Sequence, residues 1–291
     1  MISIILPSYN EAKSIESYIS KLKDSLKDCD YKYEILIVDD GSTDNTQEIV
    51  KNLDITCIKH NINLGYGSAL KTGIKNSKFE TILISDLDES YPTTHVPEII
   101  KKYFDSKKDN NTGFDMIVGE RSGKYYNETV HKTIFRKILK FIVEWTTGTK
   151  INDINSGFRI FSKSTIIKFF PHLSNAFSFS TSSTLAYLLS NKIVTYIPIE
   201  YLKREGKSHV KLFRDSLRTL QYILQAILYY NPLKVFLLFT FLFISISFIF
   251  LLFYWYLNSK IIIFLSLIFL SSSILSFLIG LIATAISEQK K

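Results

Sequence analysis

Residues 81–88 read Thr-Ile-Leu-Ile-Ser-Asp-Leu-Asp, an apolar run that ends in two acidic residues. A short apolar run bounded by turn residues is typical of a buried strand. Similar runs recur at residues 2–6, 34–38, 56–59 and 116–118. Segments with the apolar spacing of helices separate them, as at Ile15, Ile19, Leu22 and Leu26. This alternation predicts an α/β fold with a mostly parallel sheet flanked by helices.

Polar residues follow two of these predicted strands directly, as Pro7-Ser8-Tyr9-Asn10-Glu11 and Asp39-Asp40-Gly41-Ser42-Thr43-Asp44. In an open parallel sheet, ligands bind beyond the carboxyl ends of the strands. Each turn alone is typical of any connection between a strand and a helix. Together, their carboxylates and amides can hydrogen-bond the base and ribose of a nucleotide. We therefore expect nucleotide contacts from Pro7, Tyr9, Asn10, Glu11, Asp39 and Asp40.

A glycine-rich segment, Asn63-Leu64-Gly65-Tyr66-Gly67-Ser68-Ala69, precedes a predicted helix at residues 68–76. Its glycines would let backbone amides approach a ligand closely. The segment lacks the Gly-Lys-Ser/Thr of an ATPase loop and the glycine spacing of a dinucleotide fingerprint, so both classes are disfavoured. We expect further contacts to the nucleotide sugar from Gly65, Gly67 and Lys71.

The two acidic residues Asp86 and Asp88 form the sharpest chemical signal. Carboxylates one residue apart at a strand end can bind one hard divalent cation, Mg²⁺ or Mn²⁺, which would bridge the two phosphates of a sugar nucleotide. A lone pair of this kind is more often a solvated acidic turn. Here the pair follows two nucleotide-like turns at the same predicted edge of the sheet, and this combination favours a metal site.

The C-terminal part of the chain is strongly apolar, with Lys260 as the single charged residue between Val235 and Ile286. A helix over residues 235–257 would be roughly 35 Å long, enough to cross the hydrocarbon core of a bilayer. A second span is expected at residues 261–286. The short connection makes the two spans an antiparallel hairpin, and the basic residues near its open end place that end in the cytoplasm. We predict an integral membrane protein with a cytoplasmic catalytic domain.

Three parts follow from this division: a catalytic domain at residues 1–210, an amphipathic segment at 211–232 and the hairpin at 233–291. Residues 132–145 and 211–228 both have the pattern of amphipathic helices, which either lie in the membrane interface or pack on the sheet. The net charge of +8 fits anionic lipid, and no nucleic-acid motif accompanies it. Small residues at spacing four predict helix contact within the hairpin or in a homo-oligomer: Ser276, Gly280 and Thr284.

These motifs, together with Asn155-Ser156-Gly157-Phe158-Arg159 and Arg204-Glu205-Gly206-Lys207-Ser208, resemble glycosyltransferase family 2, in its dolichol-phosphate mannose synthase-like branch. The resemblance covers about the first 210 residues. It implies a GT-A type, Rossmann-like fold, an inverting reaction, a nucleotide sugar donor and a polyprenyl-phosphate acceptor. It also implies that Asp39 and Asp40 contact the nucleoside, and that Asp86 and Asp88 contact the diphosphate and metal.

The sequence departs from that branch in two places. Ser90 stands where many members have a glutamine metal ligand, and residues 179–184 lack an acidic residue that some members carry. Transfer to a sugar hydroxyl needs a general base, whereas a phosphate monoester is already mostly dianionic at pH 7. A lipid phosphate needs cations instead. The candidates that would bind it are Arg121, Arg136, Arg204, Lys207 and Ser208.

The sequence thus predicts a metal-dependent hexosyltransferase that moves a sugar onto undecaprenyl or dolichyl phosphate at the cytoplasmic membrane face. Asp88, Arg121 and Arg204 are the expected catalytic residues, with Ser90 a weaker candidate as metal ligand. Two alternatives stay open. One is a membrane glycosyltransferase that acts on a glycolipid or glycan, and the other is a non-catalytic membrane scaffold of the same fold.

Overall fold

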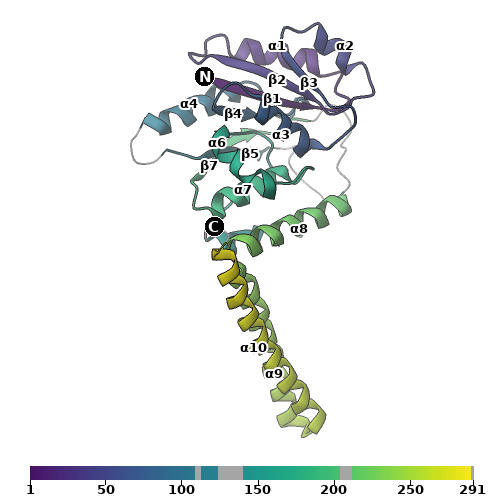
Figure 1. Cartoon of the computed structure of the whole chain (residues 1–291), viewed down its shortest axis with the longest axis vertical. Coiled ribbons are helices and arrows are strands. Elements are labelled where there is room, and N and C mark those ends of the chain that lie inside the picture. The colour runs from purple at the N-terminus through teal and green to yellow at the C-terminus, as the bar shows by residue number, and fades with distance from the viewer. Residues whose placement is uncertain (109–112, 124–139, 204–211, 290–291) are drawn as a thin grey trace. The chain divides into compact units, whose positions relative to one another are not determined.

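The computed structural model of the 291-residue chain describes residues 1–108, 113–123, 140–203 and 212–289 (Figure 1). The chain forms two compact units, Met1–Ile223 and Leu224–Lys291. The first unit contains a seven-stranded sheet with helices, and the second contains two long apolar helices. The domain limits expected at residues 210 and 232 stay a prediction.

The sheet has the strand order β3-β2-β1-β4-β6-β5-β7. Its strands are β1 (Ile2–Ser8), β2 (Tyr33–Asp39), β3 (Thr56–Lys59), β4 (Thr81–Ile84), β5 (Met116–Ser122), β6 (Arg159–Ser162) and β7 (Val194–Glu200). Strand β6 runs antiparallel to both of its neighbours, and all other pairs are parallel. The mostly parallel sheet expected from the sequence is confirmed.

Helices cover both faces of this sheet because successive side chains of a strand point to opposite sides. In β1, Ile4 packs in a cluster with apolar residues of α1 (Ile15–Ser25) and α4 (His95–Lys108), while Ile5 packs with α3 (Tyr66–Asn76), α6 (Lys163–Phe169) and α7 (Phe179–Leu189). Two shorter helices complete the unit, α2 (Thr46–Lys51) and η2 (Phe170–His172). The core is therefore double, with one layer on each side of the sheet.

The strand register brings the sequence motifs to one end of the sheet. The parallel strands β1, β2 and β4 end at Ser8, Asp39 and Ile84. The antiparallel strand β6 begins at the same end, because its first residue, Arg159, pairs with Ile84 and with Val118 of β5. Residues 7–11, 39–44, 86–90, 119–121 and 153–159 therefore lie together beyond this edge.

The second unit contains a hairpin of α9 (Pro232–Leu257) and α10 (Lys260–Glu288), preceded by the end of α8 (Leu212–Tyr230). Both hairpin helices are long and apolar enough to cross a membrane, and only 11% and 17% of their most apolar windows are buried. A core helix of a soluble protein would be mostly buried. The two helices run side by side in Figure 1. Two transmembrane candidates occur at the positions that the sequence predicted.

Small residues form the seam between α9 and α10. The hydroxyl of Ser247 donates to the carbonyl of Ser266 at 2.8 Å, and that of Ser266 donates back to the carbonyl of Ser247 at 3.0 Å. Ser276 Oγ donates to the Phe236 carbonyl, and a Cβ added to Gly280 would lie 2.7 Å from Phe236 Cβ. Contact within the hairpin, one of the two alternatives for the Ser276 and Gly280 stripe, is thus present.

The two amphipathic segments differ in what the structure describes. Of the first, residues 140–147 are helical, and residues 132–139 lie outside the described part of the chain. The second corresponds to α8, where Leu217, Leu224 and Leu228 are exposed on the helix surface.

Candidate active site

Hydrogen bonds join the two turns that follow β1 and β2. Asn10, which adopts a left-handed conformation with φ +58°, accepts at Oδ1 from the backbone N–H groups of Thr43 and Asp44, at 2.8 and 3.3 Å. Its own N–H donates to Ser42 Oγ. The next residue, Glu11, donates its N–H to Thr46 Oγ1. The turn at residues 7–11 and the turn at residues 39–44 are thus joined by hydrogen bonds at one end of the sheet, and the nucleotide contacts expected from Pro7, Tyr9, Asn10 and Glu11 stay a prediction.

Asp39 and Asp40 lie at this surface with different partners. The carboxylate of Asp39 accepts from the N–H of Ser42 and from the side-chain amide of Gln47, both at 2.9 Å. The carboxylate of Asp40 accepts from the N–H groups of Leu64 and Gly65 and contacts His60 Nδ1 at 2.7 Å. Asp40 therefore anchors the glycine-rich segment, a role that sequence reasoning missed. Contacts from both carboxylates to a nucleoside stay a prediction.

Two glycines of that segment pack closely against the backbone of residues 174–175. A Cβ at Gly65 would lie 2.6 Å from the carbonyl oxygen of Asn175, and one at Gly67 would lie 2.3 Å from that of Ser174. Lys71 Nζ donates to the Leu173 carbonyl and to Asn175 Oδ1, both at 2.7 Å. Burial lowers the pKa of Lys71, and the charge of nearby Lys75 lowers it further. These contacts give Gly65, Gly67 and Lys71 a structural role, and their contact with a nucleotide sugar stays a prediction.

The acidic pair lies directly beyond β4. Tyr66 donates its hydroxyl to Asp86 Oδ1 at 2.9 Å. Asp88 is 4% exposed, and its Oδ1 accepts from both the N–H and the hydroxyl of Ser90. Ser90 thus holds the Asp88 carboxylate in place through two hydrogen bonds. Direct binding of a metal by Ser90 stays a prediction.

The chemistry of this pair fits a divalent cation. A Cβ added to Gly157 would lie only 2.8 Å from Asp86 Oδ2, so a glycine is needed for the backbone to approach this carboxylate so closely. In the described residues, no group of three or more His, Cys, Asp or Glu could hold a metal ion. Mg²⁺ is commonly bound by one or two carboxylates together with substrate phosphates and water. Asp86 and Asp88 would supply the protein's share of such a site.

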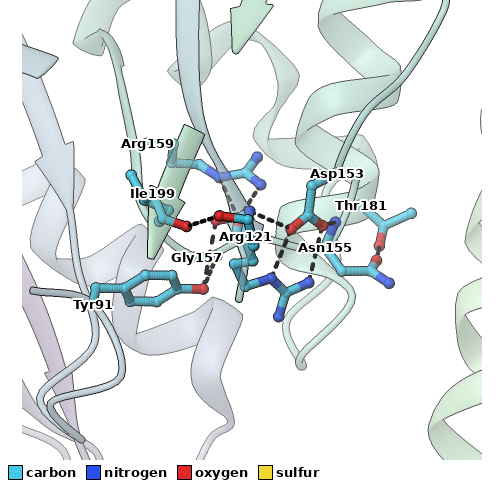
Figure 2. A network of polar contacts seen from close by, with 10 residues as sticks. Tyr91, Arg121, Asp153, Asn155, Gly157, Arg159, Thr181 and Ile199 are labelled. Atoms are coloured by element: carbon cyan, nitrogen blue, oxygen red, sulfur yellow. Dashed lines mark hydrogen bonds and ion pairs between the residues drawn. The ribbon is translucent and has the colours of Figure 1, made fainter. Parts of the chain in front are cut away.

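Arg121 lies on β5 and forms a bidentate ion pair with Asp153 (Figure 2). Its Nε donates to Asp153 Oδ2 at 2.7 Å and its Nη2 to Oδ1 at 2.9 Å. The guanidinium also lies over the ring of Tyr201, 5.5 Å from the centroid. Burial raises the pKa of Asp153, but the charge and hydrogen bonds of Arg121 outweigh it and hold that pKa below its ordinary range. The sequence reasoning missed Asp153, although it stands two residues before the Asn155 motif.

Arg159 is fully buried between this site and α7. Its guanidinium donates to the Ser180 carbonyl at 2.9 Å, to Ser183 Oγ at 2.8 Å and to Thr184 Oγ1 at 3.2 Å. Burial lowers the pKa of Arg159, as desolvation disfavours its charge. The run of hydroxyl residues in α7 thus supplies acceptors to a buried cation. Thr181 continues it toward the site by donating to Asn155 Oδ1 (Figure 2).

Four candidates for binding the acceptor phosphate lie outside the residues that the structure describes: Arg136, Arg204, Lys207 and Ser208. Of the cations predicted to bind this phosphate, Arg121 is the one whose surroundings the structure describes.

Comparisons with known proteins agree with this geometry. A model of glycosyl transferase family 2 matches residues 3–170. CsbB of Bacillus subtilis (strain 168), named as a candidate glycosyltransferase, is 28% identical over 215 residues, which are 72% of this chain and 61% of the relative. The undecaprenyl-phosphate 4-deoxy-4-formamido-L-arabinose transferase of Salmonella choleraesuis (strain SC-B67) is 24% identical over 244 residues, covering 80% of this chain and 69% of that protein. The chain thus spans less than two thirds of CsbB.

Solved structures share the fold at low sequence identity. A crystal structure of glucosyl-3-phosphoglycerate synthase from Mycobacterium tuberculosis in complex with uridine diphosphate is 16% identical, with a TM-score of 0.61 and coverage of 78% of this chain and 79% of that one. A second structure of that enzyme, with Mn²⁺, uridine diphosphate and glucosyl-3-phosphoglycerate, gives a TM-score of 0.58 at 17% identity and the same coverage. The family model matches more than half of the chain, and the chain therefore belongs to glycosyl transferase family 2.

Proposed function

We propose that this protein transfers a sugar from a nucleoside diphosphate sugar to a polyprenyl phosphate at the cytoplasmic face of a membrane. The observation that carries the proposal is the Arg121–Asp153 pair at the same end of the sheet as Asp86 and Asp88. It offers a fixed cation for an anionic acceptor.

The surroundings of Arg121 favour an acceptor that needs no general base. The carboxylate of Asp153 is bound by the guanidinium, and its lowered pKa makes it a weak base at neutral pH. Helix α7, which faces Asn155 through Thr181, contains no acidic residue. A hydroxyl acceptor must lose its proton to a base, whereas a phosphate monoester is mostly ionised already. These features together favour a phosphate acceptor over a sugar hydroxyl.

In the proposed reaction, an oxygen of the lipid phosphate attacks the anomeric carbon of the bound sugar. The bond from that carbon to the diphosphate breaks, its electron pair leaves with the nucleoside diphosphate, and the anomeric configuration inverts. Mg²⁺ or Mn²⁺ held by Asp86 and Asp88 would offset charge on the diphosphate. The turns around Asn10 and Asp39 would hold the nucleoside, and Arg121 would orient the acceptor phosphate. Positioning and electrostatic stabilisation thus supply the catalysis.

The membrane placement rests on the apolar hairpin and on α8. An acceptor with a polyprenyl chain stays in the bilayer, so its phosphate is presented at the membrane surface. The hairpin would anchor the protein, and the exposed Leu217, Leu224 and Leu228 would let α8 lie in the interface. The name of the Salmonella relative, an undecaprenyl-phosphate sugar transferase, supports the same class of acceptor.

The test is a transfer assay with purified full-length protein in detergent or nanodiscs. Radiolabelled sugar nucleotides are offered with undecaprenyl phosphate, dolichyl phosphate or the corresponding polyprenols that lack the phosphate. We expect a lipid-linked sugar with the phosphates and none with the polyprenols, and no product from the Asp88→Asn variant. Preferential transfer to a glycolipid or glycan hydroxyl would overturn the proposal, as would the absence of transfer from every donor.

A further inference from the structure

Glu89, the residue after Asp88, adopts a backbone conformation that its residue type disfavours. Its φ is +57°, in the left-handed region. Residues with a Cβ seldom occupy this region, and the strained conformation persists only where the surrounding structure holds the residue there. Outliers of this kind cluster at functional sites. We therefore looked for what the conformation does and for what holds it.

The left-handed turn at Glu89 sets the orientation of the Asp88 carboxylate. It folds the chain back so that the N–H of Ser90 donates to Asp88 Oδ1 at 3.1 Å, and the Ser90 hydroxyl donates to the same oxygen. Asp88 is buried, so water does not compete freely for that oxygen.

The side chain of Glu89 is held by α1. Ser17 Oγ donates to one carboxylate oxygen at 2.8 Å, and Lys21 Nζ donates to the other at 2.7 Å. The Glu89 side chain is 19% exposed. Its carboxylate is thus directed at the helix.

The same helix contacts the turn on both sides of Glu89. The Tyr18 hydroxyl forms a buried hydrogen bond of 2.7 Å with Ser85 Oγ, just before the acidic pair. Ser25 Oγ donates to Thr93 Oγ1 at 2.9 Å, a few residues after it. Because residues 17, 18, 21 and 25 recur at helical spacing, one face of α1 supports the whole segment from Ser85 to Thr93.

We propose that Glu89 is a positioning residue of the metal-binding turn, held in its left-handed conformation by Ser17 and Lys21 so that Asp88 is preset for a divalent cation. The inference rests on the proposed use of Asp86 and Asp88 as metal-binding carboxylates. It assigns α1 a role in the donor site beyond covering the sheet, and it assigns Glu89 a role through its backbone rather than as a ligand.

Three substitutions separate the backbone role from a general role of the side chain. Glu89→Ala removes the two bonds from α1 but keeps the cost of the left-handed backbone. Glu89→Gly removes the same bonds and also removes that cost, because glycine adopts positive φ readily. Glu89→Gln removes the charge but keeps a side-chain oxygen that accepts hydrogen bonds, beside an amide group that donates them. Glu16→Ala is the matched control, because Glu16 is an exposed glutamate on α1, the helix that holds the Glu89 side chain.

The main readout is Mn²⁺ affinity, measured by electron paramagnetic resonance with the full-length protein. It is measured in the presence of whichever of UDP, GDP, CDP or dTDP the wild-type protein binds. An apparent affinity falls in proportion to the population of the binding-competent state. We expect the Mn²⁺ dissociation constant to rise about tenfold in Glu89→Ala, and to stay within about threefold of wild type in Glu89→Gly, Glu89→Gln and Glu16→Ala.

Two further measurements exclude simple unfolding. The binding of the corresponding nucleoside monophosphate without metal should be unchanged in all variants, because the base and ribose are expected to contact other turns. In transfer assays, the turnover number of Glu89→Ala should recover at saturating Mn²⁺, which a lost catalytic group would not allow. Equal weakening in Glu89→Gly and Glu89→Ala would overturn the backbone role, and a wild-type affinity in Glu89→Ala would overturn any role.

The failure of this inference is distinguishable from failure of the proposed function. Wild-type protein that binds Mn²⁺ and a nucleoside diphosphate but does not glycosylate a lipid phosphate would refute the proposed acceptor alone, and the Glu89 comparison would still decide the inference. Wild-type protein that binds no Mn²⁺ with any of the four nucleotides would overturn the inference, because Asp88 would then have no cation to bind.

Discussion

Replacing Asp153 by asparagine tests the ion pair on which the proposed acceptor site depends. In the folded protein, the Asp153 side chain is 3% exposed and that of Arg121 is 14% exposed. The substitution keeps the size of the side chain and one oxygen acceptor, but it removes the charge. Arg121 then remains nearly buried without its carboxylate partner.

The magnitude follows from this burial. Removing one partner of a buried ion pair typically costs about 3–5 kcal/mol, because the other charge is left uncompensated. An asparagine can still accept one hydrogen bond, and Arg121 keeps a small exposure to water. We therefore expect Asp153→Asn to lower the free energy of unfolding by about 2–3 kcal/mol and Asp153→Ala by about 3–5 kcal/mol.

Tryptophan fluorescence can report unfolding of the first unit separately. The chain has two tryptophans, and Trp145 lies in the first unit while Trp255 lies in the hairpin. In a Trp255→Phe background, urea titration followed at Trp145 measures the stability of the first unit. Asp105→Asn is the control, because its carboxylate pairs with Lys108 at the surface, and this variant should keep the wild-type midpoint.

The pH dependence of the stability difference has a predictable direction. The pKa of Asp153 is lower in the folded protein than the reference value, so the Arg121–Asp153 pair contributes fully to the free energy of unfolding above the unfolded pKa of about 3.9. That contribution is lost as the pH falls through the folded pKa. The stability difference between wild type and Asp153→Asn should thus be constant from pH 8 to about pH 5 and should narrow below about pH 4. A difference below about 0.5 kcal/mol at pH 7 would refute the reasoning, since such a value is typical of surface pairs.

Three further predictions concern the metal turn, the acceptor and the hairpin. Asp88→Asn should abolish transfer and leave the Trp145 unfolding curve close to wild type, and activity near wild type would refute its role. Arg204 lies outside the described residues. The sequence predicts that Arg204→Ala weakens lipid-phosphate binding by about 1.5–3 kcal/mol and leaves donor binding unchanged. Weaker nucleotide binding in the absence of lipid would contradict this prediction. In a background with Cys29 and Cys57 replaced by serine, cysteines at Phe236 and Ser276 should cross-link within one chain, and exposed Phe277 paired with Phe236 is the control. A cross-linked dimer would instead favour contact between subunits.

The five strands expected from the sequence all occur. Four of them are apolar runs that are largely buried, whereas β3 is a mostly exposed strand at the edge of the sheet. The two strands that sequence reasoning missed have physical reasons to escape it. Strand β6 begins with a charged residue, Arg159, whose burial depends on acceptors in α7. Strand β7 contains Pro198, which is tolerated because β7 lies at the edge of the sheet.

The location of the site could be predicted better than the partners of its residues. Strand ends and turn residues identify where Asp39, Asp40 and Asp88 lie, because parallel strands end at one edge. The partners come from distant parts of the chain. Asp40 contacts His60, and Lys71 contacts Asn175, which is 104 residues away. No local pattern distinguishes a lysine that binds a loop carbonyl from one that binds a phosphate, since both need the same donor.

Helix α7, which contains no acidic residue, supplies the hydrogen-bond acceptors of the buried Arg159. A carboxylate among Ser180, Ser183 and Thr184 would lie beside the Arg159 guanidinium and form an ion pair with it, and its pKa would fall. It would then be a poor base, even if it reached the acceptor. Neutral hydroxyls satisfy Arg159 without adding a second carboxylate to Asp153, whose charge already acts on the guanidinium. The hydroxyl run therefore suits the proposed phosphate acceptor, because it adds neither a general base, which a phosphate does not need, nor a further negative charge.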